Sequence, residues 1–300
     1  MKRMYKNTKF RAESLNLIER VNSIITEYSS KGYELTLRQV YYQLVATGVI
    51  ENTERSYKNL GTLISNARLA GLVDWESIVD RTRNLRGFNY DSTPESTLNN
   101  MAMNYKTDPW IGQENYVEVW VEKDALVDIV GKIAGQLDID YFSCRGYVSQ
   151  SAMYRAARRL NRQVSIGKNV TILHLGDHDP SGIDMSRDIE TRLNTFEVFP
   201  KVERIALNMN QIELYNPPPN PTKITDSRAK EYITNFGYEC WELDALKPEV
   251  INDLIFQKVT PLINYSLMNS LKSKMQEERD LIETIAYNWD QIKNDYGMSE

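Results

Sequence analysis

The chain contains very few of the residues that form disulfides or bind soft metals. Its 300 residues include 2 cysteines, Cys144 and Cys240, and 2 histidines, His174 and His178. Two cysteines are too few for a disulfide framework or a structural zinc site, and two histidines exclude a histidine-rich metal site. This composition favours the reducing environment of the cytoplasm.

Long hydrophobic runs are also missing. No apolar run approaches the ~20 residues that a membrane-spanning helix needs, and no apolar core follows the basic residues 1–6 as in a signal peptide. We therefore expect no membrane association. With 41% hydrophobic and 26% charged residues, the composition is that of an ordinary globular protein. A length of 300 residues indicates two domains, since a domain typically holds ~100–200 residues.

Positive charge is scarce overall but concentrated at one end. The formal net charge is −5. Residues 1–90 hold 14 Lys and Arg against 9 Asp and Glu, whereas the remainder holds 22 against 32. A basic N-terminal region is typical of a module that contacts DNA, and an acidic remainder is compatible with metal binding. The alternative is an asymmetry that arose by chance.

The N-terminal region shows three helical patterns. Apolar residues recur at helical spacing over residues ~14–29. Thr36 and Gln39 form a capping-box pattern that opens a helix running to Thr47, and a third helix is expected over residues ~53–70. Three short helices predict a winged-helix or helix-turn-helix domain over residues 1–90. A plain helical bundle with a solvated basic face is the alternative.

If the region binds DNA, its third helix is the expected recognition helix. Its outer face carries cations, and more cations follow it along the chain. Such side chains neutralise phosphates and fix a protein on a duplex. The DNA-binding residues predicted here are Arg55, Lys58, Arg68, Arg81 and Arg83, and Lys123 of the α/β domain is predicted to contact DNA as well.

Strands and helices alternate after a linker at residues 91–114. Strands are expected near residues 116–122, 141–142, 169–175 and 202–208, with helices near 124–136, 150–163 and 183–194. This alternation predicts an α/β domain over residues 115–215, with a mostly parallel sheet covered by helices. A largely helical C-terminal extension is expected over residues 216–300, following the proline-rich stretch at 217–221.

Two carboxylates end one of the predicted strands. The apolar residues 172–175 lead to Asp177 and Asp179, and Pro180 and Gly182 then break the extended chain. Ligands of open α/β sheets bind at the carboxyl ends of the strands. Alternate carboxylates at that edge suit Mg²⁺, which prefers oxygen ligands. The alternative is a polar turn with a helix cap.

Glu122 ends the first strand of the α/β domain in the same way, so Glu122, Asp177 and Asp179 are the predicted metal ligands. His178 lies between the two aspartates, and in an extended chain its side chain points away from them. Lys123 is interpreted as a phosphate-neutralising residue, with an ordinary surface lysine as the alternative. Two further acids, Glu242 and Asp244, are interpreted as surface residues because they alternate with apolar positions.

A pair of tyrosines forms a second candidate centre on the helix that Thr36 opens. Tyr41 falls on its apolar face and is expected in the core. Tyr42 lies one position further round, over Arg38 at the i, i+4 spacing. A neighbouring cation would favour the phenolate, so Tyr42 is a candidate nucleophile toward a phosphodiester.

These motifs together resemble one protein family. A glutamate at one strand end and Asp-x-Asp at another resemble the TOPRIM domain. VEKDA at 121–125 and DHDPSGI at 177–183 resemble the branch of the topoisomerase VI A subunit and the protein that makes meiotic double-strand breaks. LRQVYY at 37–42 resembles that family's tyrosine motif. The resemblance implies a TOPRIM, Rossmann-like sheet, Mg²⁺ or Mn²⁺ as cofactor, and DNA cleavage with Tyr42, Arg38 and Glu122 as catalytic residues.

The resemblance also implies partners. Members of the family act on double-stranded DNA as homodimers in which the tyrosine of one subunit meets the metal of the other, and full A subunits work with an ATPase partner. This chain is shorter than a full A subunit and looks like a compact member of the phage or mobile-element type. Some compact relatives cleave by hydrolysis, so a hydrolytic nuclease is an alternative to tyrosine attack. The sequence is also compatible with a non-catalytic DNA-binding scaffold and with a primase-like or RNA-directed TOPRIM enzyme.

Overall fold

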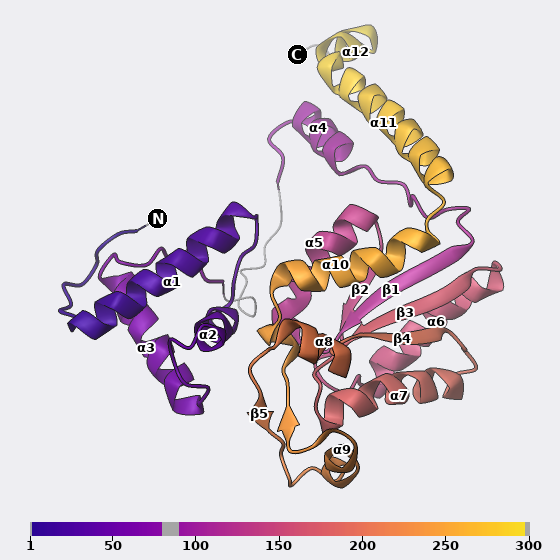
Figure 1. Cartoon of the computed structure of the whole chain (residues 1–300). Coiled ribbons are helices and arrows are strands. Elements are labelled where there is room, and N and C mark those ends of the chain that lie inside the picture. Colours follow the sequence, from indigo (N-terminus) through magenta and orange to yellow (C-terminus); the bar gives the residue numbers. More distant parts are fainter. Residues whose placement is uncertain (1, 80–89, 298–300) are drawn as a thin grey trace.

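A four-stranded parallel sheet forms the centre of the larger part of the molecule (Figure 1). The computed structural model describes residues 2–79 and 90–297. The predicted fold class, α/β with a parallel sheet and an N-terminal helical region, is confirmed. In the order β2-β1-β3-β4 the strands are β2 Asp140–Ser143, β1 Asn115–Val121, β3 Asn169–Leu175 and β4 Lys201–Ala206.

Helices cover both faces of this sheet. Helices α5 (Val127–Leu137) and α10 (Pro248–Val259) pack on one face, and α6 (Gln150–Ser165) and α7 (Pro180–Thr195) pack on the other. Alternate residues of β1 point to opposite faces, as the pleat requires. Val119 and Val121 meet the α5 side, whereas Trp120 meets the α6 side.

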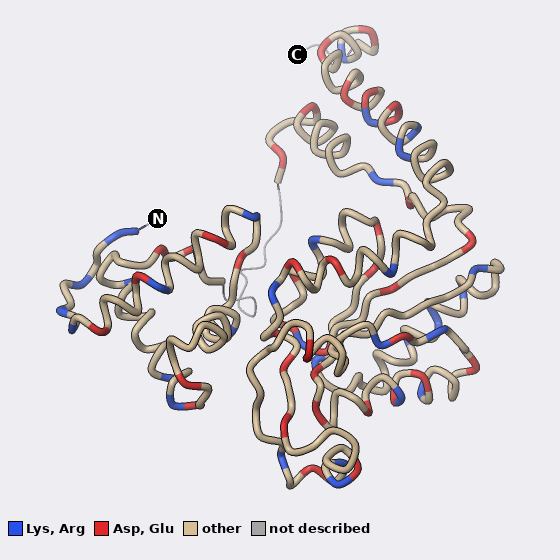
Figure 2. Tube along the Cα trace, viewed as in Figure 1, with Lys and Arg blue, Asp and Glu red and all other residues tan. Residues whose placement is uncertain are grey.

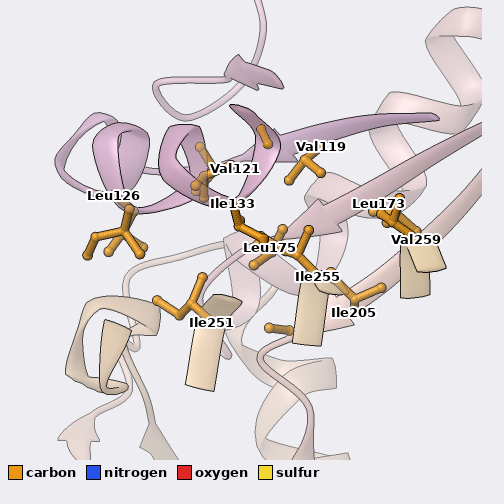
Figure 3. Packing of buried hydrophobic residues seen from close by; sticks show 14 of the residues in the cluster. Val119, Val121, Leu126, Ile133, Leu173, Leu175, Ile205, Ile251, Ile255 and Val259 are labelled. Carbon is orange, nitrogen blue, oxygen red and sulfur yellow. The ribbon is translucent and has the colours of Figure 1, made fainter. Parts of the chain in front are cut away.

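The core on the α5 side continues beyond the predicted end of the α/β domain at residue 215. Figure 3 shows Ile251, Ile255 and Val259 of α10 packed beneath Leu173 and Leu175 of β3. These side chains are essentially excluded from water. Burying each such side chain contributes on the order of 2 kcal/mol, so α10 is part of the α/β unit rather than of a separate extension.

The other face of the sheet contains a buried acid. Glu118 of β1 is 1% exposed. Its carboxylate accepts two hydrogen bonds from Arg159 of α6, at 2.7 and 2.8 Å, and further bonds from the Tyr116 hydroxyl and the Trp120 indole. A buried carboxylate is tolerated when it is paired and hydrogen-bonded in this way.

The N-terminal region is built from α1 (Ala12–Ser30), α2 (Leu37–Ala46) and α3 (Glu54–Leu69) around its own hydrophobic core. The Thr36–Gln39 capping box at the start of α2 is present. Within residues 2–79, strand pairing is limited to the isolated bridges Met4–Ala70 and Leu35–Ile78, so this stretch contains no β-wing. The described N-terminal residues are therefore helical, as a helix-turn-helix domain would be.

The helical region contacts the α/β unit through several polar bonds. The Lys31 ammonium lies 2.7 Å from the Glu249 carboxylate, and the Asn252 amide donates to the Tyr33 hydroxyl. Ala245 contributes to the core of the helical region itself. The two regions thus share an interface centred on α2, α10 and the short 3-10 helix η2 (Leu243–Ala245).

The remaining elements complete the chain around the sheet and its covering helices. In Figure 1, α4 and the long α11 run beside each other, and α11 leads away from the sheet. No helix in the described ranges is long and apolar enough to cross a membrane. These elements are η1 (Asp124–Leu126), α4 (Pro94–Asn104), α8 (Met209–Tyr215), β5 (Asn220–Pro221), α9 (Ala229–Phe236), β6 (Glu239–Cys240), η3 (Thr260–Leu262), α11 (Tyr265–Tyr287) and α12 (Trp289–Asp295).

The Glu118–Arg159 pair yields a stability prediction. Arg159→Met should lower the free energy of unfolding by about 3 kcal/mol, because it leaves a buried carboxylate without its cation. Arg158→Met is the matched control: Arg158 is exposed on the same helix and its loss should cost less than ~0.5 kcal/mol. Urea unfolding followed by circular dichroism measures both, and equal effects would contradict the assignment.

Candidate active site

Neighbouring strands bring the predicted metal ligands to one edge of the sheet. Val121 pairs with Leu175, so Glu122 and Asp177 both lie just beyond the carboxyl ends of adjacent strands. The backbone N–H of Asp177 donates to Glu122 Oε2 at 2.9 Å. The structure thus places these two carboxylates together, where the strand pattern predicted them.

Asp179 completes the group at the start of α7. Its Oδ1 accepts hydrogen bonds from the Gly182 N–H at 2.6 Å and the Ser181 hydroxyl at 2.9 Å. A Cβ at residue 182 would lie 2.2 Å from the Asp177 carbonyl oxygen, so only glycine fits this turn. The helix-cap interpretation is therefore correct for Asp179, and the cap fixes the position of its carboxylate.

Arg204 of β4 holds the loop that carries these acids. Its guanidinium donates to the carbonyl oxygens of Gly176 at 2.9 Å, Asp177 at 2.6 Å and Gly182 at 2.8 Å. Burial lowers the pKa of Arg204 to about 10. A buried arginine that binds backbone carbonyls supports the site without facing its ligand. Arg204 was not among the residues predicted from the sequence, since nothing in a strand pattern marks such a role.

Two acids interpreted as surface residues lie inside the site. Asp244 is fully buried and Glu242 is largely buried. The Lys123 ammonium lies 2.9 Å from Asp177 Oδ2 and 3.2 Å from Asp244 Oδ1, and it also pairs with Glu242. The prediction that Lys123 faces DNA is wrong because three carboxylates surround its side chain. The surface interpretation of Glu242 and Asp244 is wrong for the same reason.

Arg38 reaches the same acids from the helical region. Its Nε lies 2.9 Å from Asp244 Oδ2, and its guanidinium also pairs with Glu242. Arg38 comes from α2, whereas Lys123 follows β1. Two cations from distant parts of the chain therefore neutralise three carboxylates, those of Asp177, Glu242 and Asp244.

Tyr42 lies over Arg38 as the helical spacing predicted, with its ring centroid 5.8 Å from the guanidinium carbon. The expectation that only Tyr41 is buried is wrong, because each tyrosine is 4% exposed. Asn220, from a distant part of the chain, lies near the Tyr42 hydroxyl. Burial and the charges of Asp244 and Glu242 raise the pKa of Tyr42 to about 12 despite Arg38. The expected stabilisation of a phenolate by Arg38 is therefore outweighed.

Both candidate centres open into one cavity of about 680 Å³ between the helical region and the α/β unit. A single chain supplies both the tyrosine and the carboxylates that line it. This differs from the expectation that each chain holds half a site. Its lining includes Arg38, Tyr41, Tyr42, Asp177, Asp179, Ser181, Asn220, Lys223 and Glu242.

The neighbouring cations do not fully neutralise the carboxylates at the edge of the sheet. Burial, together with the charges of Glu122, Asp244 and Glu242, raises the pKa of Asp177 to about 8 even beside Lys123. Burial and the charge of Asp179 also raise the pKa of Glu122. A group of carboxylates with raised pKa values favours the arrival of another cation.

The ligand types fit a hard divalent cation, because every candidate donor is a carboxylate oxygen. The side-chain positions are those of an ion-paired group: within the described residues, no three His, Cys, Asp or Glu side chains are arranged to hold a metal ion. Asp177 Oδ1 accepts the Leu243 N–H and Oδ2 faces Lys123. Glu122, Asp177 and Asp179 are the carboxylates at the sheet edge that would hold a divalent cation if one binds here.

The predicted DNA-binding residues separate into three groups. Arg55 and Lys58 are exposed on α3, although Lys58 pairs with Glu54 at 2.6 Å. The prediction for Arg68 is wrong, since its guanidinium donates to the carbonyl oxygens of Trp75 and Ile78. Arg81 and Arg83 lie outside the described residues.

His178 lies outside the carboxylate group, as the alternation of the strand end predicted. Its Nδ1 is 2.8 Å from the Tyr232 hydroxyl, and its ring meets those of Phe236 and Trp241 edge-on. Burial lowers the pKa of His178 to about 4. The ring therefore anchors α9 and β6 beside the site.

Comparison with protein-family models, with curated proteins and with solved structures finds no match to this chain. The geometry of the site is therefore the basis on which a function can be proposed.

The Lys123 ion pairs yield a prediction with a definite pH dependence. Lys123→Met should lower the free energy of unfolding by about 3 kcal/mol at neutral pH, because it removes one of the two cations that face these acids. Despite burial, the charges of Lys123 and Arg38 lower the pKa of Glu242 below its usual value of 4.5. A lowered folded-state pKa gives stability that is present above the unfolded pKa and is lost as the pH falls through the folded pKa. The part of the deficit that comes from this charge pair should therefore be full at neutral pH and shrink as the pH falls below 4.5.

Lys201→Met is the matched control. Lys201 is 69% exposed and pairs with one acid, Glu203, and such surface pairs contribute less than ~1 kcal/mol. Urea unfolding at several pH values measures both variants. A Lys123→Met deficit that does not change with pH would show that the lost packing of the side chain, rather than its charge, is responsible.

Proposed function

We propose that this chain cleaves DNA strands with the help of a divalent metal, as a TOPRIM enzyme of the topoisomerase VI A type. One observation carries the proposal. Glu122, Asp177 and Asp179 lie at the carboxyl edge of a parallel sheet, and Asp177 and Asp179 line a cavity that Tyr42 and Arg38 also line. A scaffold that only binds DNA has no use for such a costly group of buried acids.

The residues have distinct roles in this proposal. Glu122, Asp177 and Asp179 would hold a Mg²⁺ ion, which would neutralise charge that develops on the scissile phosphate. Arg38 lines the cavity and can bind a phosphate oxygen, since a guanidinium matches phosphate geometry. Asp244 keeps Arg38 in place through its buried carboxylate.

The proposed cleavage has two candidate mechanisms, which differ in the nucleophile that attacks the phosphate. A Tyr42 attack gives a protein–DNA adduct, and the side chain lines the cavity beside Arg38. Attack by water gives a hydrolytic nuclease. The pKa of Tyr42, raised to about 12 by burial, favours the hydrolytic candidate, because the phenol is then a weak nucleophile at neutral pH.

The proposed substrate is double-stranded DNA, and the proposed assembly is a symmetric homodimer in a cytoplasmic location. Cutting both strands of a duplex takes two sites, and a two-fold dimer supplies them in related positions. An ATPase or other partner subunit belongs to the topoisomerase form of the proposal. The hydrolytic form has no need of one.

Removal of a metal ligand should abolish cleavage. Asp177→Asn and Glu122→Gln should each lower cleavage of supercoiled plasmid in Mg²⁺ or Mn²⁺ by at least about 100-fold, because metal stabilisation of the transition state amounts to several kcal/mol. Glu203→Gln, at a half-exposed acid outside the cavity, should retain wild-type cleavage. Plasmid left intact by the wild-type protein with either metal would refute the proposed activity.

Substitution of the tyrosines separates the two nucleophiles. If Tyr42 attacks, Tyr42→Phe should abolish both cleavage and the protease-sensitive retention of DNA in a gel. If water attacks, Tyr42→Phe should cleave within about threefold of wild type, because less than 1 kcal/mol is at stake. Tyr41→Phe is the matched control, since its hydroxyl bonds Asn52 and Thr53 instead. A wild-type adduct that persists in Tyr42→Phe would contradict the assignment of this residue.

A further inference from the structure

One helix of the α/β unit carries an arginine stripe that the candidate site does not use. Residues 141–176 contain 6 Lys and Arg and no Asp or Glu, in a chain that has 41 acids. Four of the six lie on α6. Figure 2 shows all Lys and Arg positions of the described chain in blue and all Asp and Glu positions in red. Residues 91–300 as a whole contain more Asp and Glu than Lys and Arg, so the charge balance of residues 141–176 is opposite to that of the region around them.

Three of the four arginines are exposed and share one face of α6. Arg155, Arg158 and Arg162 follow the i, i+3, i+7 spacing that aligns side chains on a helix. Within the described residues none of their side chains has an ion pair or hydrogen bond. The fourth, Arg159, is turned inward and bound to Glu118. Helix α6 thus carries one arginine in a buried ion pair, Arg159, and three exposed arginines without a side-chain partner among the described residues.

The spacing of the stripe matches a nucleic-acid backbone. Seven residues of α-helix span ~10 Å, and successive nucleotides of one DNA strand rise ~3.4 Å along the duplex axis. The three guanidinium groups therefore cover a length that corresponds to about three phosphates. The exposed ring of Tyr154, next to Arg155, adds a planar surface at one end.

We propose that the face of α6 formed by Arg155, Arg158 and Arg162 is a second contact surface for the backbone of duplex DNA. None of these residues lines the candidate cavity, and α6 packs on the face of the sheet opposite α5 and α10. The stripe therefore holds a stretch of duplex other than the one at the carboxylates. This inference rests on the proposed function in taking DNA as the partner.

The test compares charge variants in a metal-free binding assay. Arg155→Gln, Arg158→Gln and Arg162→Gln combined should weaken binding to a labelled duplex. The slope of log K against log salt concentration should become shallower by about 2–3, since each lost phosphate contact removes about 0.9. The matched control removes the same charge at Lys272, Lys274 and Lys293, each of which already faces a carboxylate, and should leave the slope unchanged.

A second variant tests whether weaker binding by the glutamine variant is caused by misfolding rather than by the loss of charge. Arg155→Lys, Arg158→Lys and Arg162→Lys combined keeps the positive charge and should retain the wild-type slope. A glutamine variant with the wild-type slope would overturn the inference, and so would a wild-type protein that does not bind duplex DNA. Displacement of the duplex by polyglutamate as readily as by unlabelled duplex would assign the stripe to an acidic protein partner and overturn it as well.

The same assay separates this inference from the proposed activity. Wild-type protein that shows the arginine-dependent slope yet leaves plasmid intact in Mg²⁺ and Mn²⁺ would refute cleavage and support the stripe. Wild-type protein that cleaves plasmid, with a glutamine variant that has the wild-type salt slope, would support cleavage and refute the stripe.

Discussion

The arrangement of the molecule depends on the pairing of two cations with three buried carboxylates. Lys123 and Arg38 lie between Asp177, Glu242 and Asp244, which come from parts of the chain far apart in sequence. Carboxylates so close together in a poorly hydrated interior repel strongly, and the cations beside them offset part of that repulsion. The ion pairs therefore hold the end of the sheet, the 3-10 helix η2 and α2 in one place.

This requirement explains why the two regions of the chain meet as they do. Arg38 must come from α2 to reach Asp244, and α2 then brings Tyr42 to the same cavity. Asn52 strengthens the contact by donating to the Pro219 carbonyl and the Asn220 side chain. The position of the tyrosine beside the carboxylates is thus a consequence of charge neutralisation within one chain.

Local patterns in the sequence predicted the elements well and the burial of charged residues poorly. The strand ends located Glu122 and Asp177 because parallel neighbours bring their carboxyl ends to one edge. Asp244 and Lys123 are 121 positions apart, and no periodicity marks a pair at that separation. Likewise, the helical pattern of α2 assigned one buried face. The burial of Tyr42 needs the β5 segment with Asn220, which arrives from another part of the chain.

The carboxylates in the cavity would repel the phosphate backbone of the proposed DNA substrate. Arginines elsewhere on the surface could offset this repulsion. Asp177, Asp179 and Glu242 line the cavity and would repel a phosphate backbone before any metal is present. Charges attract DNA over only ~8 Å at physiological ionic strength, so attraction must come from surfaces close to the backbone. In the proposed function, exposed cations on α3 and α6 would supply this attraction outside the cavity, while Arg38 and Lys123 offset part of the negative charge inside it. Such a separation of binding charge from site charge would let a protein of net charge −5 accept DNA.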